Sequence, residues 1–293
     1  MTVGGAGRVG DSGEAGREAR TAADEVTAAA AAALAALERL RPRLAAAGLG
    51  LGLADVGEPV LAPAGPAEAS AAAAMPPRRR REFLAGREAA RRALRAVGVD
   101  CGEIPREGRL PVFAPGRAAS LSHSAGIAVA VARAPGGHAP LGCDLELRPL
   151  PGDAARLVLG PDEEPLLGTA AGAGTWSLTG LFSAKETAWK ALHLAPGRAG
   201  TASMRTLRDL RAEPCGDALH IGPRIDPRAG RSSRPRVGAS SGPSGLPCAG
   251  ARAGPSYGVR VRVLPVGAGV FSYALGWAGA DGRSTPVPTA RRS

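Results

Sequence analysis

The chain has 293 residues, is 44% hydrophobic and carries a formal net charge of +11, so it is long enough to bury a core and basic enough to attract anionic partners. No apolar run approaches the length of a membrane span, and the N-terminus lacks the apolar core of a signal peptide, which argues against a membrane protein. The four cysteines show neither a Cys-x-x-Cys pair nor zinc-site spacing, so we predict a soluble, reduced, cytoplasmic protein.

The first part of the chain is expected to form one helix and otherwise loops. Residues 1–16 are Gly-rich and polar and are predicted to be disordered. Residues 17–40 are rich in Ala, Glu, Arg and Leu, which favours a helix that ends at Pro42. Residues 48–77 consist largely of Gly, Pro and Ala and are predicted to be a loop with one short strand at 60–62.

An amphipathic helix and two strands are predicted next. Residues 77–97 place apolar side chains at helical spacing behind an Arg-rich start, and Gly98 ends the helix. Residues 126–132 indicate a buried strand, and residues 141–147 indicate a second one. A Gly-Gly pair lies between them, so the two strands are expected to form a hairpin.

The second half is predicted to contain two helices followed by strands. Residues 153–167 favour a helix that a Gly-Pro pair interrupts, and residues 181–192 favour another. Residues 222–256 are dominated by Gly, Pro, Ser and Arg and are predicted to be a disordered insertion. Residues 257–266 and 270–277 alternate like two strands of a closing hairpin. Shorter strands are expected near 205–210 and 218–221, and a disordered tail at 278–293.

The predicted helix at 181–192 carries the chain's only two lysines among 37 basic residues. An ammonium can lie against a phosphate as a point charge and can release a proton, whereas a guanidinium cannot, so Lys185 and Lys190 suggest a special role. Glu186 precedes Lys190 by four residues, and the two therefore share a helix face. Taken alone, this pair would more simply be an ordinary helix ion pair.

Two carboxylates follow one face of the predicted strand at 141–147. Side chains alternate along a strand, so Asp144 and Glu146 point the same way, about 7 Å apart, and could both ligate one hard cation. The alternative is the solvated face of an amphipathic strand. A third carboxylate from Glu186 would complete a magnesium site of the kind that proteins use with phosphates.

Two further segments could bind phosphate. Ser122 and His123 offer a hydroxyl and an imidazole just before a strand, although a lone His is more often structural and a Ser-His pair could also belong to a hydrolase. The arginines at 78–81 and Arg87 could clamp a terminal phosphate, although most arginine runs are solvated basic faces.

These motifs, taken in order over about residues 79–194, resemble the 4′-phosphopantetheinyl transferases, the Sfp-type superfamily and its EntD-like branch. They read Arg-Arg-Arg-Glu-Phe-x-x-Gly-Arg, Ser-Leu-Ser-His-Ser, Gly-Cys-Asp-Leu-Glu and Phe-Ser-Ala-Lys-Glu-x-x-x-Lys. The resemblance implies an α+β fold of two similar pseudo-twofold halves, each a helix packed on a small antiparallel sheet, with coenzyme A in the cleft between them. Residues 17–150 would form the N-terminal half and residues 151–277 the C-terminal half.

The implied activity is Mg²⁺-dependent transfer of the 4′-phosphopantetheine group of coenzyme A to a serine of an apo acyl or peptidyl carrier protein, with release of 3′,5′-ADP. Such carriers belong to fatty-acid, polyketide or nonribosomal-peptide synthases, and their acidic surface suits a basic enzyme. No membrane or nucleic acid is expected as a partner, and the resemblance implies a monomer.

The resemblance also implies a role for each motif residue. Asp144, Glu146 and Glu186 would be the magnesium ligands. Lys190 would lie against the pyrophosphate and protonate the departing ADP, with Lys185 supporting it. The coenzyme A phosphates would be held by Ser122 and His123, and the adenosine 3′-phosphate by Arg79, Arg87 and Arg106. Either Glu186 or Glu164 could accept the serine proton.

Two other functions fit parts of the sequence. The high pI and the Arg-rich segments would suit a nucleic-acid-binding protein without catalysis, although aromatic residues for stacking make up only 3% of the chain. The carboxylates would also suit an unrelated magnesium-dependent phosphohydrolase.

Overall fold

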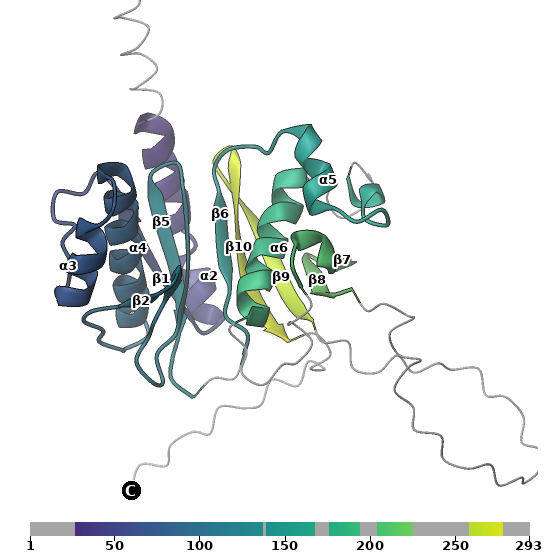
Figure 1. Cartoon of the computed structure of the whole chain (residues 1–293). Coiled ribbons are helices and arrows are strands. Elements are labelled where there is room, and N and C mark those ends of the chain that lie inside the picture. The colour runs from purple at the N-terminus through teal and green to yellow at the C-terminus, as the bar shows by residue number, and fades with distance from the viewer. Residues whose placement is uncertain (1–26, 137–138, 168–175, 194–203, 225–257, 278–293) are drawn as a thin grey trace, which may run out of the picture. The chain divides into compact units, whose positions relative to one another are not determined.

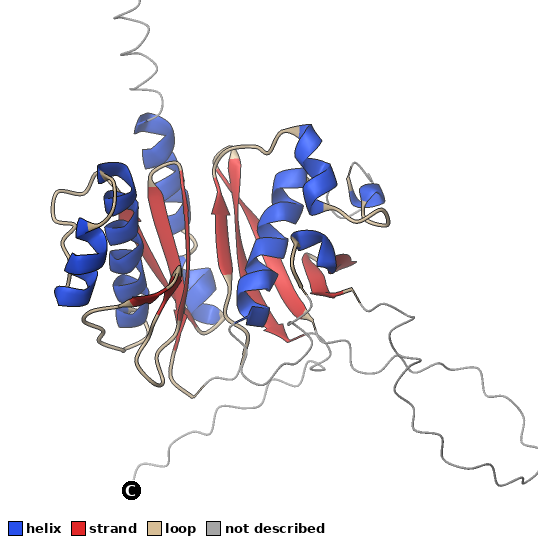
Figure 2. Cartoon of the chain, in the orientation of Figure 1, coloured by secondary structure: helices blue, strands red, loops and turns tan. Residues whose placement is uncertain are grey.

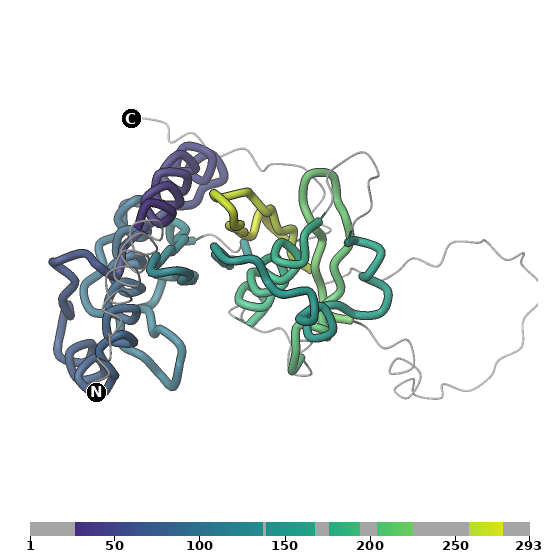
Figure 3. Tube along the Cα trace, turned by 90° about the horizontal axis from the view of Figure 1, so that it is seen from above, coloured from purple at the N-terminus to yellow at the C-terminus, as the bar shows by residue number. Residues whose placement is uncertain are grey.

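A computed structural model of the chain describes residues 27–136, 139–167, 176–193, 204–224 and 258–277 (Figures 1 and 3). The predicted disordered segments 1–16 and 278–293, and nearly all of 222–256, lie outside these residues. Within the described part, no helix is both long and apolar enough to cross a membrane. The described residues fall into two compact units, the first of which contains those up to Gly136 together with 145–149 and 264–271.

The first unit packs the long helix α4 against a three-stranded antiparallel sheet of order β1-β5-β4 (Figure 1). Alanines dominate the apolar contacts of this helix, with Ala85, Ala89 and Ala93 fully buried. A small hairpin, β2-β3, lies apart from the main sheet. The elements are α2 (Arg41–Ala46), β1 (Leu49–Asp55), α3 (Pro66–Ala73), α4 (Pro77–Arg95), β2 (Arg106–Glu107), β3 (Leu110–Pro111), β4 (Ala119–Ser124) and β5 (Ile127–Arg133).

The loop predicted at 48–77 is wrong, because this segment contains β1 and α3, while Val60 lies in an exposed turn rather than a strand. The glycines that favoured a loop serve close packing instead. A Cβ on Gly52 would lie 1.9 Å from the Ala89 carbonyl oxygen, and one on Gly50 would lie 2.3 Å from that of Ala93. The leucines of β1 alternate with these glycines, so α4 packs directly on the strand backbone.

We expect Gly52→Ala to destabilise the protein by about 2 kcal/mol or more, because the added methyl group meets helix backbone that cannot move aside. The expected fall in Tm is roughly 5 °C or more. Gly102→Ala is the matched control, since nothing lies within 4 Å of a Cβ there. Thermal melts followed by circular dichroism that coincide for the two variants would show that β1 and α4 are not this close.

Helix α6 packs against a five-stranded sheet of order β6-β10-β9-β8-β7, most of whose residues belong to the second unit (Figure 2). The closing hairpin predicted near the C-terminus is confirmed by the adjacent strands β9 and β10. The elements are β6 (Cys143–Glu146), η1 (Gly152–Ala154), α5 (Ala155–Val158), η2 (Glu164–Leu166), α6 (Leu178–His193), η4 (Leu207–Asp209), β7 (Leu210–Cys215), β8 (Ala218–Pro223), β9 (Val259–Val266) and β10 (Gly269–Trp277).

The hairpin predicted between 126–132 and 141–147 is wrong. Both edges of β5 are already paired, one with β1 and the other with β4. β6 instead joins β10, and the Ala274 N–H donates to the Gly142 carbonyl at 3.0 Å. The error arose because the segment that forms β1 was predicted to be a loop. Without β1, residues 141–147 were the next strand available to pair with β5.

Several element boundaries also differ from the prediction. The helix predicted over 17–40 is present over the described residues 27–38, and Pro42 lies in the first turn of the next helix, α2, where a missing N–H costs nothing. The helix expected at 153–167 is reduced to short pieces, broken at the Gly-Pro pair as predicted. The strand expected at 205–210 is mostly a 3-10 turn, and residues 222–223 of the expected insertion belong to β8. The α+β class, with a helix on a small antiparallel sheet in each unit, is confirmed.

Candidate functional site

The apolar face of helix α6 packs into the core and so fixes the direction of the polar face, which carries Glu186 and Lys190. Its leucines and alanines, among them Leu181, Ala184 and Ala188, are buried in the core of the second unit. The Ser177 hydroxyl caps the start by accepting the Gly180 N–H at 3.0 Å. The helix also packs closely on the chain just before β6, since a Cβ on Gly142 would lie 2.2 Å from the Thr187 carbonyl oxygen.

Asp144, Glu186 and Lys190 come together in the second unit. The Lys190 ammonium lies 2.7 Å from Asp144 Oδ1 and donates to the Cys143 carbonyl at 3.1 Å. Burial raises the pKa of Glu186, the positive charge of Lys190 opposes this, and the negative charge of Asp144 adds to it. Burial alone would lower the pKa of Lys190, but the charge of Asp144, with a further contribution from Glu186, raises it. The cluster therefore holds two acids and one protonated amine.

Glu146 follows Asp144 by two residues on β6, so the two lie on the same strand face as the sequence predicts. Asp144 is buried and Glu146 is half-buried, while Cys143 and Leu145 alternate with them and are fully buried. Carboxylates are the ligands that hard cations prefer. Among the described residues, no group of three or more His, Cys, Asp and Glu side chains has the geometry to hold a metal.

Lys185 occupies a different environment from Lys190. Its ammonium is fully buried, lies 2.6 Å from Glu163 Oε2, and donates to the backbone carbonyls of Val158 and Leu210. These contacts commit the Lys185 ammonium to Glu163 and to backbone carbonyls, so any support that it gives Lys190 is indirect. Sequence reasoning missed Glu163 and named its neighbour Glu164, which is exposed on η2.

Arg79 and His123, predicted to bind coenzyme A phosphates, lie together in the first unit. Arg79 Nη1 is 3.0 Å from His123 Nε2, and Glu82 Oε2 lies 3.2 Å from the same arginine nitrogen. Burial alone would raise the pKa of Glu82, but hydrogen bonds from Arg79 and Arg78 lower it. Ser122 precedes His123 on β4. The N-terminal turns of α4 thus meet β4 at an exposed, basic and polar site.

Arg87 and Arg106 are two further cations of this unit, and their charges repel each other. Arg87 Nε donates to the Ile104 carbonyl at 2.8 Å, and its guanidinium lies 4.6 Å from the centre of the Phe83 ring. Burial, with smaller contributions from the charges of Arg106 and Arg91, lowers the pKa of Arg87 to about 10. Two guanidinium groups that repel each other in this way would be stabilised by an anion.

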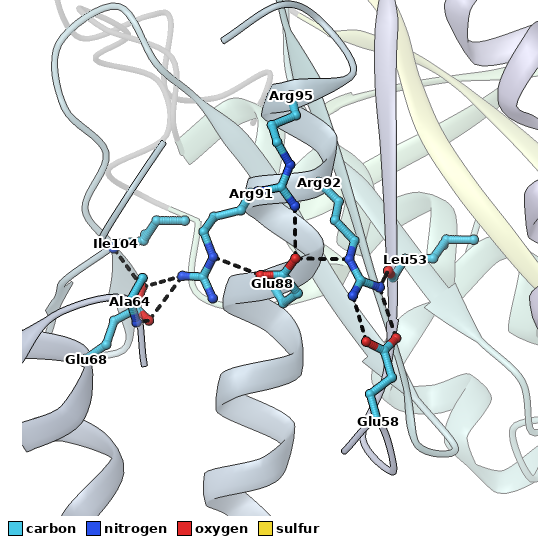
Figure 4. Close-up of polar contacts among 9 residues, drawn as sticks. All are labelled: Leu53, Glu58, Ala64, Glu68, Glu88, Arg91, Arg92, Arg95 and Ile104. Carbon is cyan, nitrogen blue, oxygen red and sulfur yellow. Dashed lines mark hydrogen bonds and ion pairs between the residues drawn. The ribbon is translucent and has the colours of Figure 1, made fainter. Parts of the chain in front are cut away.

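The later arginines of α4 are engaged by carboxylates, as Figure 4 shows. Arg91 binds the fully buried Glu68 at 2.8 Å, and Arg92 binds Glu58 at 2.6 Å. Glu68 also accepts the backbone N–H groups of Ala64 and Ile104. This network gives Arg91 and Arg92 carboxylate partners from other segments, whereas Arg79 pairs with Glu82 on its own helix and Arg87 donates to a backbone carbonyl. Sequence reasoning missed Glu68 because its partner lies 23 residues away.

Replacing Glu68 by Gln is expected to destabilise the protein by about 3 kcal/mol, because Arg91 loses the fully buried one of its two counter-charges and keeps only the half-buried Glu88. The matched control is Glu58→Gln, whose pair with Arg92 is partly exposed and should contribute about 1 kcal/mol or less. Urea denaturation measures both changes. Equal midpoints for the two variants would contradict the special role of the buried pair.

Comparison with known proteins finds a similarity for only part of the chain. Residues 67–133 match the family model described as the 4′-phosphopantetheinyl transferase N-terminal domain. A search of curated proteins found no match. The matched segment runs from the start of α3 to the end of β5 and so includes Arg79, Arg87, Arg106 and His123, but not the cluster around α6. Over this segment the chain is thus similar to the N-terminal domain of the 4′-phosphopantetheinyl transferases, which supports that superfamily and, in general terms, its chemistry.

Proposed function

We propose that this chain is a 4′-phosphopantetheinyl transferase of the Sfp-type, EntD-like kind that modifies apo acyl or peptidyl carrier proteins. The observation that carries the proposal is the meeting of Asp144, Glu186 and Lys190 around α6 in a chain whose residues 67–133 match the family's N-terminal domain. The motifs within residues 67–133 and the motifs that follow, on β6 and α6, thus point to the same reaction. A cytoplasmic monomer acting on fatty-acid, polyketide or nonribosomal-peptide synthases is part of this proposal.

The carboxylates Asp144, Glu146 and Glu186 would hold the Mg²⁺ that this activity needs, and the ion would draw them together, because the described side chains do not form a ready metal site. Their chemistry fits, since all three offer hard oxygen ligands, and burial together with the charge of Asp144 raises the pKa of Glu186, which a nearby cation would relieve. When bound, the metal supplies charge neutralisation on the pyrophosphate. The remaining steps fall to the protein's own side chains and to the carrier.

In the proposed transfer, the carrier's serine oxygen forms a bond to the β-phosphorus of coenzyme A, and the bond from that phosphorus to the oxygen of 3′,5′-ADP breaks. Lys190 would lie against the pyrophosphate and donate a proton to the departing oxygen, since its ammonium lies beside the proposed metal ligand Asp144. The serine proton would pass to Glu186 or, through water, to Glu164. The exposed position of Glu164 leaves it open to a carrier.

Residues of the first unit would bind coenzyme A. Ser122 and His123 would contact its phosphates, and Arg79, which lies against His123, would hold the 3′-phosphate together with Arg87 and Arg106. The net charge of +11 would speed encounter with an acidic carrier.

Product analysis tests the proposal against its rivals. The protein is incubated with coenzyme A and Mg²⁺, with and without an apo carrier protein, and nucleotides are separated by chromatography. We expect 3′,5′-ADP only when the carrier is present. Release of inorganic phosphate without a carrier would indicate a phosphohydrolase instead. Intact coenzyme A in every mixture, together with tight binding to DNA or RNA, would favour a nucleic-acid-binding protein.

A further inference from the structure

The buried ammonium of Lys185 is tied to several segments of the second unit. Besides Glu163 at 2.6 Å and the Val158 carbonyl at 2.8 Å, it approaches the carbonyls of Leu207 at 3.3 Å and Leu210 at 3.0 Å. An ammonium has three protons to donate, so these acceptors saturate it. No surface of Lys185 is exposed, and the ammonium is thus committed to protein groups.

Glu163, the acid of this pair, forms further hydrogen bonds and a second ion pair. Its carboxylate accepts the Gly160 and Ala212 backbone N–H groups, each at 2.7 Å, and lies 2.7 Å from Arg224. The pair therefore joins α6 to the turn before η2, to β7 and to the end of β8. It links α6 to elements far from it in sequence.

The opposite side of α6 is fixed by hydroxyl groups. Ser183 Oγ lies 2.8 Å and Thr187 Oγ1 lies 2.7 Å from the hydroxyl of Ser272 on β10, and all three residues are fully buried. At 3.6 residues per turn, Lys185 lies roughly opposite Ser183 and Thr187 around the helix, and Glu186 and Lys190 fall between the two anchors. A rotation of α6 that moved Glu186 and Lys190 away from Asp144 would thus break both anchors.

We propose that the buried Lys185–Glu163 pair is a positioning device that sets the rotation of α6 and so holds Glu186 and Lys190 against Asp144. The catalytic consequence rests on the proposed transferase function. Stability alone does not explain the pair, because a buried ion pair is often no more stabilising than apolar residues of similar size. A positioning role does explain the pair, because a misplacement of about 1 Å at reacting groups can cost about 100-fold in rate.

Steady-state kinetics of Lys185→Met, Glu163→Gln and the double variant test this role, with Glu213→Gln, an exposed acid on β7, as the control for the same substitution. We expect kcat to fall by about 100-fold in Lys185→Met, with KM for coenzyme A within about threefold and an unchanged circular dichroism spectrum. The double variant should be no slower than Lys185→Met, because the two residues act as one unit. Glu213→Gln should match the wild type.

Two kinetic results would overturn the proposal. One is wild-type kcat in a folded Lys185→Met or Glu163→Gln variant. The other is multiplication of the two single losses in the double variant, which would assign Lys185 a catalytic role independent of Glu163. Should Lys185→Met fail to fold, Glu163→Gln, which keeps the side-chain size, decides the question alone.

Amide hydrogen exchange followed by mass spectrometry gives a readout that does not depend on activity. We expect peptides from α6 to exchange faster in Glu163→Gln, and to the same extent in Lys185→Met, while peptides from β9 and β10 exchange as in the wild type. Unchanged α6 exchange would contradict the anchor. A wild-type protein that transfers nothing while its α6 responds in this way would refute the proposed function and leave the anchor standing.

Discussion

Replacing Glu186 by Gln is expected to reduce phosphopantetheinyl transfer by about a thousandfold or more, because the variant would remove one of the three proposed Mg²⁺ ligands from the cluster with Asp144 and Lys190. Metal-assisted charge stabilisation is worth several kcal/mol, and about 1.4 kcal/mol corresponds to a factor of ten in rate. The fold should not suffer, since burial already raises the pKa of this carboxyl and favours a neutral side chain. Initial rates of carrier modification at several Mg²⁺ concentrations measure the effect.

The same substitution at Glu164 is the matched comparison. Full activity of Glu164→Gln, beside an inactive and folded Glu186→Gln, would leave Glu186 as the acceptor of the serine proton. Near wild-type rates for Glu186→Gln would remove this residue from the site and would contradict the role given to the α6 cluster.

Replacing Lys190 by Arg is expected to lower kcat by about 100-fold, which is the order of effect for losing a general acid. Arginine keeps the positive charge beside Asp144, but it does not release a proton, and its planar guanidinium is larger than the ammonium that lies 2.7 Å from Asp144 Oδ1. KM for coenzyme A should change only a few-fold, because the charge remains. Pre-steady-state and steady-state kinetics with saturating carrier separate the two parameters.

Lys190→Met is the companion variant, since it removes both the charge and the proton. It should lose affinity for coenzyme A as well as turnover. If Lys190→Arg turned over like the wild type, the proton-donating role would be wrong and only an electrostatic one could stand.

The sequence predicts the two long helices well because each carries its own signals. Residues 77–97 combine an Arg-rich start, apolar spacing and a terminal glycine, and Gly98 indeed adopts a positive φ of 75°. The strand β1 was missed because Gly50 and Gly52 favour a loop locally, whereas their function is close packing on α4. Such a contact joins segments about 40 residues apart, so the residues next to each glycine in the sequence do not reveal it.

The candidate site divides in the same way. The spacing in the sequence alone predicts that Glu186 and Lys190 share a helix face and that Asp144 and Glu146 share a strand face. Sequence could not separate Lys185 from Lys190, because the difference lies in Glu163 and in backbone carbonyls of distant segments. It likewise could not show that Arg91 and Arg92 are bound by Glu68 and Glu58.

The mass of a carrier protein tests the central claim most directly. An apo acyl or peptidyl carrier is incubated with the full chain, coenzyme A and Mg²⁺, and its intact mass is then determined. We predict a gain equal to one phosphopantetheine group, absent from a carrier whose acceptor serine is replaced by Ala and absent with Glu186→Gln. No gain with several apo carriers, while coenzyme A remains intact, would contradict the assignment of this chain as a phosphopantetheinyl transferase.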